Sequence, residues 1–303
     1  MSFSYHLLLL FFLIASAPAF SDCAQQFDRL GGIHYLEKGS GQPIVLIHGA
    51  SSNLHEFLAS GMVEKLAANF HVIAIDRPGM GLSDPPADES ERPMQSQIEA
   101  IEAFIEAKKL ERPVLLGHSL GAAVAMGLAV RAPQKYRGVV SVAGAISPVK
   151  PGGTWYTALT TVPVIGTLAR YTLFPVVGPL IMDKALEETF SPNEVPNDYR
   201  AKACVDRIFN PKVFRSNALH LEAVFDFLKG IYPLYDTLAD LRFLLLYGRQ
   251  DTRITAEKHV SLFQEKHSNP KVVWFENTGH LPQYSHLDEI IQNIGSFFAP
   301  NPA

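Results

Sequence analysis

Cysteine is scarce in this chain of 303 residues, which has only Cys23 and Cys204. Two cysteines are too few for a cysteine-rich metal site, and no His-Glu-x-x-His or similar ligand spacing occurs. We therefore expect no metal. In an oxidising compartment the two cysteines could pair, but their geometry does not follow from the sequence.

Positive charge is not in excess either. The chain has 26 Lys and Arg against 30 Asp and Glu, a net charge of -4, and no block of like charges. This balance argues against nucleic acid as a partner. A Gly-x-Gly-x-x-Gly motif is also missing, so we expect no dinucleotide and no other cofactor. The 47% hydrophobic content suits an ordinary globular core.

Long apolar runs are absent except near the N-terminus. Residues 7–14 are leucine, phenylalanine and isoleucine, small residues follow, and no charged side chain precedes Asp22. This pattern is typical of a signal peptide over residues 1–21, cleaved after Ala19 or Ser21, and predicts a periplasmic or secreted protein. The run is shorter than the ~18 residues of a spanning helix, yet an uncleaved N-terminal anchor is the alternative.

Short apolar runs recur along the rest of the chain and suit strands that are buried on both faces. Helix-like stretches lie between most of them, which predicts an α/β fold with a mostly parallel sheet flanked by helices. Only seven residues separate the first two strands, so we expect these two to be antiparallel. The predicted strands cover 33–36, 44–47, 72–75, 114–116, 139–142, 243–247 and 271–275, and the helices 57–69, 94–110, 120–132, 256–266 and 285–299.

The alternation stops over residues 147–235, a span with many aromatic side chains and with prolines at 163, 175 and 179. We interpret this span as a helical lid, because an insertion of this length is more often functional than a plain connector. The alternative is a small second core. The remaining residues, 22–146 and 236–303, would then form the main domain.

A serine lies at the apex of the pentapeptide Gly-His-Ser-Leu-Gly, residues 117–121. It follows a predicted strand and precedes a predicted helix, a turn that projects the hydroxyl of Ser119 away from the sheet. Ligands in such sheets bind beyond the carboxyl ends of the strands. Asp251 and His280 also follow predicted strands, and His48-Gly49-Ala50 follows a fourth.

Together these motifs resemble the α/β-hydrolase superfamily, from about residue 30 to the C-terminus. The resemblance implies an α/β-hydrolase fold in which Ser119 is the nucleophile, His280 the general base and then acid, and Asp251 the carboxylate that orients the imidazole. It also implies an oxyanion hole made by the backbone N–H groups of Ala50 and Leu120.

Other acidic and histidine residues compete for these roles less well. Asp226, Asp236 and Asp240 precede the strand that Asp251 follows. His48 and His118 are interpreted as residues that shape loops near the site. The segment 76–83, with glycines at 79 and 81, is interpreted as a structural turn.

Departures from the motifs of known subfamilies narrow the range of reactions that this chain could catalyse. A serine stands where haloalkane dehalogenases and epoxide hydrolases carry aspartate, and Ser51 replaces the proline of the epoxide-hydrolase His-Gly-x-Pro motif. We predict hydrolysis of a fairly hydrophobic ester or lipid, with peripheral membrane contact left open, because an apolar lid suits an acyl or aromatic ligand. Carbon–carbon hydrolysis, perhydrolysis and non-catalytic binding are the alternatives; oligomeric state does not follow from the sequence.

Overall fold

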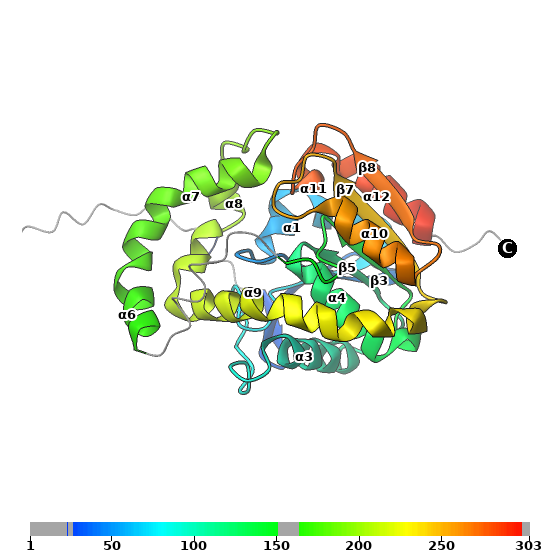
Figure 1. Ribbon diagram of the computed structural model, residues 1–303, viewed down its shortest axis with the longest axis horizontal. Coiled ribbons are helices and arrows are strands. Elements are labelled where there is room, and N and C mark those ends of the chain that lie inside the picture. Colours follow the sequence, from blue (N-terminus) through cyan, green and yellow to red (C-terminus); the bar gives the residue numbers. More distant parts are fainter. Residues whose placement is uncertain (1–22, 24–26, 151–163, 299–303) are drawn as a thin grey trace, which may run out of the picture.

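The computed structural model describes residues 23, 27–150 and 164–298, and it contains one eight-stranded sheet with helices on both faces (Figure 1). The strand order is β1-β2-β4-β3-β5-β6-β7-β8, parallel from β4 to β8. The strands are β1 (Asp28–Leu30), β2 (Ile33–Lys38), β3 (Gln42–Ile47), β4 (Phe70–Ile75), β5 (Val114–His118), β6 (Gly138–Val142), β7 (Arg242–Gly248) and β8 (Lys271–Phe275). This confirms the predicted α/β-hydrolase fold.

The central strands are apolar on both sides because a helical layer covers each face of the sheet. In β3, Val45 and Ile47 point into one core and Ile44 and Leu46 into the other, and all four are fully buried. The first layer includes α3 (Pro93–Ala107), α4 (Leu120–Arg131) and α10 (Ala256–Lys266), and the second α1 (His55–Ala59), α2 (Met62–Leu66) and α12 (Leu287–Phe298). Short elements η2 (Pro133–Lys135) and α11 (Pro282–Ser285) complete the main domain.

All seven predicted strands are present, and three details differ from the sequence-based expectation. Strand β1 was missed because it is short and begins with two charged residues. Strands β2 and β3 do run in opposite directions, but they are not neighbours, since β4 lies between them. The helix expected over 57–69 is two helices, because Gly61 adopts a left-handed φ of 76°.

Between β6 and β7 the regular elements of the described residues are all helices. The elements are α6 (Ile165–Thr172), α7 (Phe174–Phe190), α8 (Tyr199–Lys202), η3 (Val205–Phe209), α9 (Pro211–Ile231) and η4 (Tyr232–Leu238). The end of α9 and η4 pack against α3 and α4, and their Phe227, Leu228 and Tyr235 join the core of the main domain. Only the first part of the insertion, from α6 to η3, therefore lies beyond the sheet (Figure 1), while residues 151–163, Pro163 among them, lie outside the described part.

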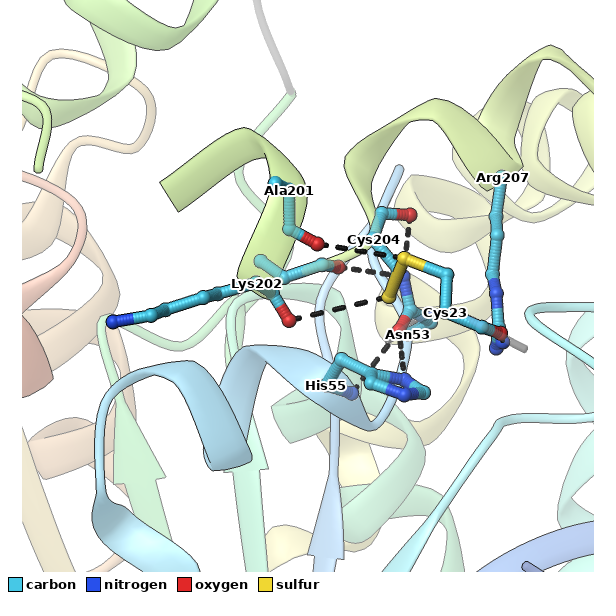
Figure 2. Close-up of a disulfide and its surroundings, with 8 residues drawn as sticks. Cys23, Asn53, His55, Ala201, Lys202, Cys204 and Arg207 are labelled. Carbon is cyan, nitrogen blue, oxygen red and sulfur yellow. Dashed lines mark hydrogen bonds between the residues drawn. A yellow bond between two sulfur atoms is a disulfide. The ribbon is translucent and has the colours of Figure 1, made fainter. Parts of the chain in front are cut away.

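A disulfide connects the start of the described chain to the insertion. Cys23 pairs with Cys204, with their Cα atoms 5.6 Å apart (Figure 2). Beside the disulfide, the Asn53 side-chain amide donates hydrogen bonds to the carbonyls of Ala203 and Cys204. The insertion is thus joined to the main domain both covalently and by buried hydrogen bonds.

Within the described ranges, no single helix is long and apolar enough to cross a membrane. Helices α6 and α7 reach that length and composition only as a pair, and they are bent by 68° where they meet. The apolar run 7–14 and the predicted cleavage sites lie outside the described residues.

Candidate active site

Ser119 lies at a sharp turn between β5 and α4. Its backbone has φ 50° and ψ −119°, a conformation that costs a residue with a side chain about 1–3 kcal/mol. The two flanking glycines make the turn sterically feasible. A Cβ on Gly117 would lie 2.4 Å from the Ala122 nitrogen, and one on Gly121 would lie 2.0 Å from the Ile47 carbonyl oxygen. The sequence motif therefore has a steric cause at both of its glycines.

The structure brings Ser119, His280 and Asp251 into one hydrogen-bonded chain. The Ser119 Oγ lies 2.9 Å from the His280 Nε2, and the His280 Nδ1 lies 2.8 Å from an Asp251 carboxylate oxygen. Each residue follows a parallel strand, β5, β8 and β7 respectively, so all three meet at the carboxyl edge of the sheet. The serine can lose its proton to an imidazole that a carboxylate holds in place.

Asp251 is held in its ionised form. Its carboxylate is fully buried, and burial alone would raise its pKa. The charge and hydrogen bond of His280, together with the N–H groups of Ile254 and Arg253, more than compensate and lower the pKa of Asp251. The carboxylate can therefore stabilise an imidazolium on His280 at neutral pH.

The backbone N–H groups of Leu120 and Ala50 are the donors proposed for the oxyanion hole. Each belongs to a peptide group whose carbonyl, that of Ser119 or Gly49, is held by hydrogen bonds. The Ser119 carbonyl accepts hydrogen bonds from the N–H groups of Ala122 and Ala145. The Gly49 carbonyl accepts one from the Arg77 Nη2 at 3.1 Å. Because C=O and N–H point in opposite directions across a trans peptide, these bonds fix the directions of the Leu120 and Ala50 N–H groups.

The loop that carries Ala50 is also held at its other end. The Ser51 N–H donates to the Asn217 Oδ1 at 2.7 Å, and the Asn217 Nδ2 donates to the Ser51 hydroxyl at 3.0 Å. Ser51 has a φ of 54°, which a residue with a side chain rarely adopts without such support. Because Asn217 lies on α9, the insertion helps to set the geometry of this loop.

Arg77 is a fully buried cation beneath this loop. Its Nε donates to the His48 carbonyl at 2.9 Å and its Nη1 to the Gln97 Oε1 at 2.9 Å. His48 in turn accepts the Arg77 backbone N–H at its Nε2, so this nitrogen carries no proton. Burial and the neighbouring guanidinium lower the pKa of His48 to about 3. His48 is therefore a neutral, structural residue, as the sequence interpretation expected.

His118 and Glu56 form a buried ion pair behind Ser119. The His118 Nδ1 lies 2.6 Å from a Glu56 oxygen, and the His118 Nε2 donates to the His280 backbone carbonyl at 3.1 Å. Burial opposes both charges, but their attraction outweighs it: the pKa of Glu56 falls to about 2 and that of His118 rises. His118 thus connects the serine turn to the loop of His280.

Several of these residues were not singled out from the sequence. Arg77, Glu56 and Asn217 lie far along the chain from the groups they hold. Arg77 lies within the turn 76–83, but the sequence assigns it no role of its own. By contrast, the rival carboxylates Asp226, Asp236 and Asp240 are all exposed, which agrees with the choice of Asp251.

The turn over 76–83 is structural, as expected. The buried Asp76 carboxylate accepts the N–H groups of Leu54 and Leu82 and contacts the His34 ring at 2.8 Å. A Cβ on Gly81 would lie 2.2 Å from that carboxyl group. In the part of the chain that the structure describes, no group of three His, Cys, Asp or Glu could hold a metal ion.

Residues 44–293 match the model of the alpha/beta hydrolase family. The chain belongs to this family. A relative from Mycobacterium tuberculosis, an uncharacterized protein, is 26% identical over 273 residues, which cover 86% of this chain and 76% of the relative.

Two solved structures extend the comparison of this alpha/beta hydrolase. The 2-hydroxy-6-oxo-6-phenylhexa-2,4-dienoate hydrolase from Rhodococcus sp. strain RHA1 has a TM-score of 0.70 at 22% identity and covers 88% of this chain and 95% of its own. A membrane phospholipase A, described as a bacterial virulence factor, has a TM-score of 0.63 at 26% identity. The match covers 88% of this chain and 81% of the phospholipase. The first likeness supports the fold alone.

Proposed function

We propose that this alpha/beta hydrolase cleaves a carboxylic ester of a fairly hydrophobic substrate through an acyl-enzyme. The observation that carries the proposal is the hydrogen-bonded chain from the Ser119 hydroxyl through His280 to Asp251. A serine with this support is a nucleophile for acyl transfer. The membrane phospholipase A among the similar structures is consistent with an ester of lipid type.

The reaction would proceed in two halves. The Ser119 Oγ attacks the ester carbonyl carbon while the His280 Nε2 takes the hydroxyl proton, and the N–H groups of Ala50 and Leu120 bind the resulting oxyanion. His280 then protonates the departing alcohol, which leaves an acyl group on Ser119. Water, deprotonated by His280, attacks this ester and releases the carboxylic acid and the free serine.

A fluorophosphonate probe tests the nucleophile directly. We expect wild type to be labelled and Ser119→Ala to remain unlabelled, with turnover of nitrophenyl esters reduced by roughly 10⁶. Circular dichroism of the variant should match wild type, because the substitution removes only one hydroxyl. Folded wild-type protein that resists the probe would contradict the proposal.

Carbon–carbon hydrolysis is the second candidate, since meta-cleavage product hydrolases are among the structural neighbours. It would use the same three residues on a vinylogous ketone. Parallel assays with a dienone and with nitrophenyl esters of increasing chain length separate the two. A kcat/KM for the dienone above that for every ester would favour the second candidate.

A further inference from the structure

The insertion presents an apolar surface to solvent. Nine of the ten large hydrophobic side chains that are exposed in the described part of the chain lie between Val164 and Ile181. Among them, Leu168 is 65% and Leu180 80% exposed. Soluble monomers rarely expose contiguous apolar patches of more than a few hundred Å². We call this surface of α6 and α7 the outer face.

The first half of helix α7, up to Met182, is apolar on two sides, and only one of them faces protein. Phe174, Gly178 and Met182, spaced four residues apart, face inward. The Phe174 ring stacks on Phe214 with centroids 4.6 Å apart, and a Cβ on Gly178 would lie 2.2 Å from the Phe209 ring. The residues at 173, 176, 177, 180 and 181 form the opposite side and are exposed. A helix that is apolar all round requires a second apolar environment.

We propose that the outer face binds the interfacial region of a lipid bilayer. From residue 164 through 182 the sequence has no Asp, Glu or Lys. The single cation there, Arg170, is 6% exposed and donates to the Thr167 hydroxyl at 3.0 Å, so it does not place its charge on the outer face. The exposed charges of α7 begin only with Asp183 and Lys184, beyond Ile181, so the face itself can enter an apolar phase without burying a charge.

The shape of the helix pair favours a position along the bilayer surface. At 1.5 Å per residue, the eight residues of α6 and the seventeen of α7 give helices of about 12 Å and 26 Å. Neither reaches across the roughly 30 Å hydrocarbon core, and the 68° bend prevents the pair from acting as one spanning helix. Helices that lie in the interface bury only one apolar side.

The disulfide brings the N-terminal part of the chain to the same end of the molecule. Cys23 is bonded to Cys204, which directly precedes η3 (Figure 2). Helix η3 in turn packs against the inward side of α7, where Phe209 meets Gly178. The 22 residues before Cys23 include the apolar run 7–14.

Helix α7 also leads from the outer face to the catalytic centre. Its last turns contact the loop after β7, where the Arg253 Nη2 donates to the Ala185 carbonyl at 2.8 Å. Beyond its end, the Ser191 carbonyl oxygen lies 2.1 Å from where a Cβ on Gly279 would be, one residue before His280. If the proposed function holds, bilayer binding places the site beside lipid esters; the binding itself does not depend on turnover.

Tryptophan probes in the full chain test the proposal. Leu180→Trp places a fluorophore on the outer face, and Leu234→Trp is its matched control, because Leu234 is a 47% exposed leucine outside this face. With vesicles of phosphatidylcholine, we expect the emission of Leu180→Trp, corrected for wild type, to shift to the blue and to be quenched by dibrominated acyl chains. The corrected emission of Leu234→Trp should change in neither respect.

A charge test complements the probes. In Leu168→Glu/Leu180→Glu, vesicle binding of the full chain should weaken about tenfold or more, whereas Leu234→Glu should bind like wild type. Residues 7–14 could keep the double variant on vesicles and hide this effect. Quenching of Leu180→Trp still tests the proposal in that case, because it reports contact of the outer face alone.

Three outcomes would overturn the proposal. The first is no vesicle binding by wild type. The second is vesicle-bound Leu180→Trp protein whose introduced fluorophore is not quenched. The third is emission from that fluorophore already blue-shifted without vesicles, which would mean that a second copy or residues 7–14 cover the face; light scattering separates these two. All these vesicle measurements can be repeated in the Ser119→Ala background, because they do not require turnover. Failure of the catalytic proposal would be seen separately, as wild-type protein that the fluorophosphonate does not label.

Discussion

At the scale of single residues, Glu56 and His118 form a buried ion pair that takes no direct part in the proposed reaction. Protonated His118 has two N–H groups, one directed at Glu56 and one at the His280 carbonyl. Glu56 is fixed in turn by the Ser52 hydroxyl at 2.6 Å and the Gln283 amide at 3.2 Å. Buried polar contacts of this kind can restrict the backbone of His280 to one position.

Glu56→Gln tests this positioning role. The substitution keeps the shape but removes the charge that raises the pKa of His118, so His118 should lose its proton at a lower pH. We expect kcat to fall by up to about 10²-fold with little change in KM, since small displacements of catalytic groups have effects of that size. The ratio of variant to wild-type kcat should decrease as the pH rises.

The exposed Glu64, which pairs with Lys38 at the surface, provides the matched control Glu64→Gln, whose ratio should stay at one. A Glu56→Gln ratio that is low but independent of pH would mean that the carboxylate only supports packing.

The three residues proposed as catalytic could be picked out from the sequence because each follows an apolar strand. Ser119, Asp251 and His280 are marked by that position and by their chemistry. The residues that hold them are not marked. Asn217 is 166 residues from Ser51, and Arg77 resembles any arginine in a loop until its burial is known. Such partners depend on tertiary packing, which no local pattern reports.

At the scale of elements, α9 has two functions that the sequence did not separate. Its second half packs on the main domain through Phe227 and Leu228, and its first half carries Asn217 to the loop of Ala50. The helix was predicted as part of the insertion, because its aromatic content resembles that of the segments before it. Its apolar contact with the main domain is made with α3 and α4, which lie beside it, and therefore depends on their position.

Asn217→Ala should remove the hydrogen bonds that connect α9 to the loop carrying Ala50. Without the Asn217 amide, the N–H of Ser51 loses its partner and the loop that directs the Ala50 N–H gains freedom. We expect kcat to fall by about 10- to 10²-fold, less than the 10²- to 10³-fold loss typical of removing an oxyanion donor. Loss of a buried hydrogen-bond partner should also lower the free energy of unfolding by about 1–3 kcal/mol.

Asn217→Asp keeps an acceptor for the Ser51 N–H and should recover part of kcat. The surface variant Asn293→Ala, on α12, serves as the control for kcat and for stability. Wild-type kcat in Asn217→Ala would show that the loop holds its geometry without the insertion.

At the scale of the whole molecule, the fold buries several histidines in neutral form. Burial lowers the pKa of His48 to about 3 and the pKa values of His55 and His259 to about 4. The hydrogen bonds agree with this, because the ring nitrogens of His48 and His259 accept the N–H groups of Arg77 and Ser147. A ring nitrogen that accepts a hydrogen bond cannot carry a proton.

These histidines predict that stability falls in mild acid. Between pH 6.5 and about 4 the unfolded chain binds up to three more protons at these sites than the folded chain, and each proton changes the free energy of unfolding by about 1.4 kcal/mol per pH unit. His118 acts in the opposite sense: because its folded pKa is raised, its contribution is present below pH 6.5 and is lost as the pH rises through the folded value. The lowered sites outnumber it, because burial also lowers the pKa of His220.

Urea unfolding with the disulfide intact should therefore give a free energy about 2–5 kcal/mol lower at pH 5 than at pH 7. His259→Gln offers a matched variant, because glutamine can accept the Ser147 N–H but does not titrate. Its loss between the two pH values should be smaller than that of wild type by about 1–2 kcal/mol. Equal free energies at pH 5 and pH 7 in wild type would mean that the folded chain takes up these protons, which would require the buried imidazoles to reach solvent without global unfolding.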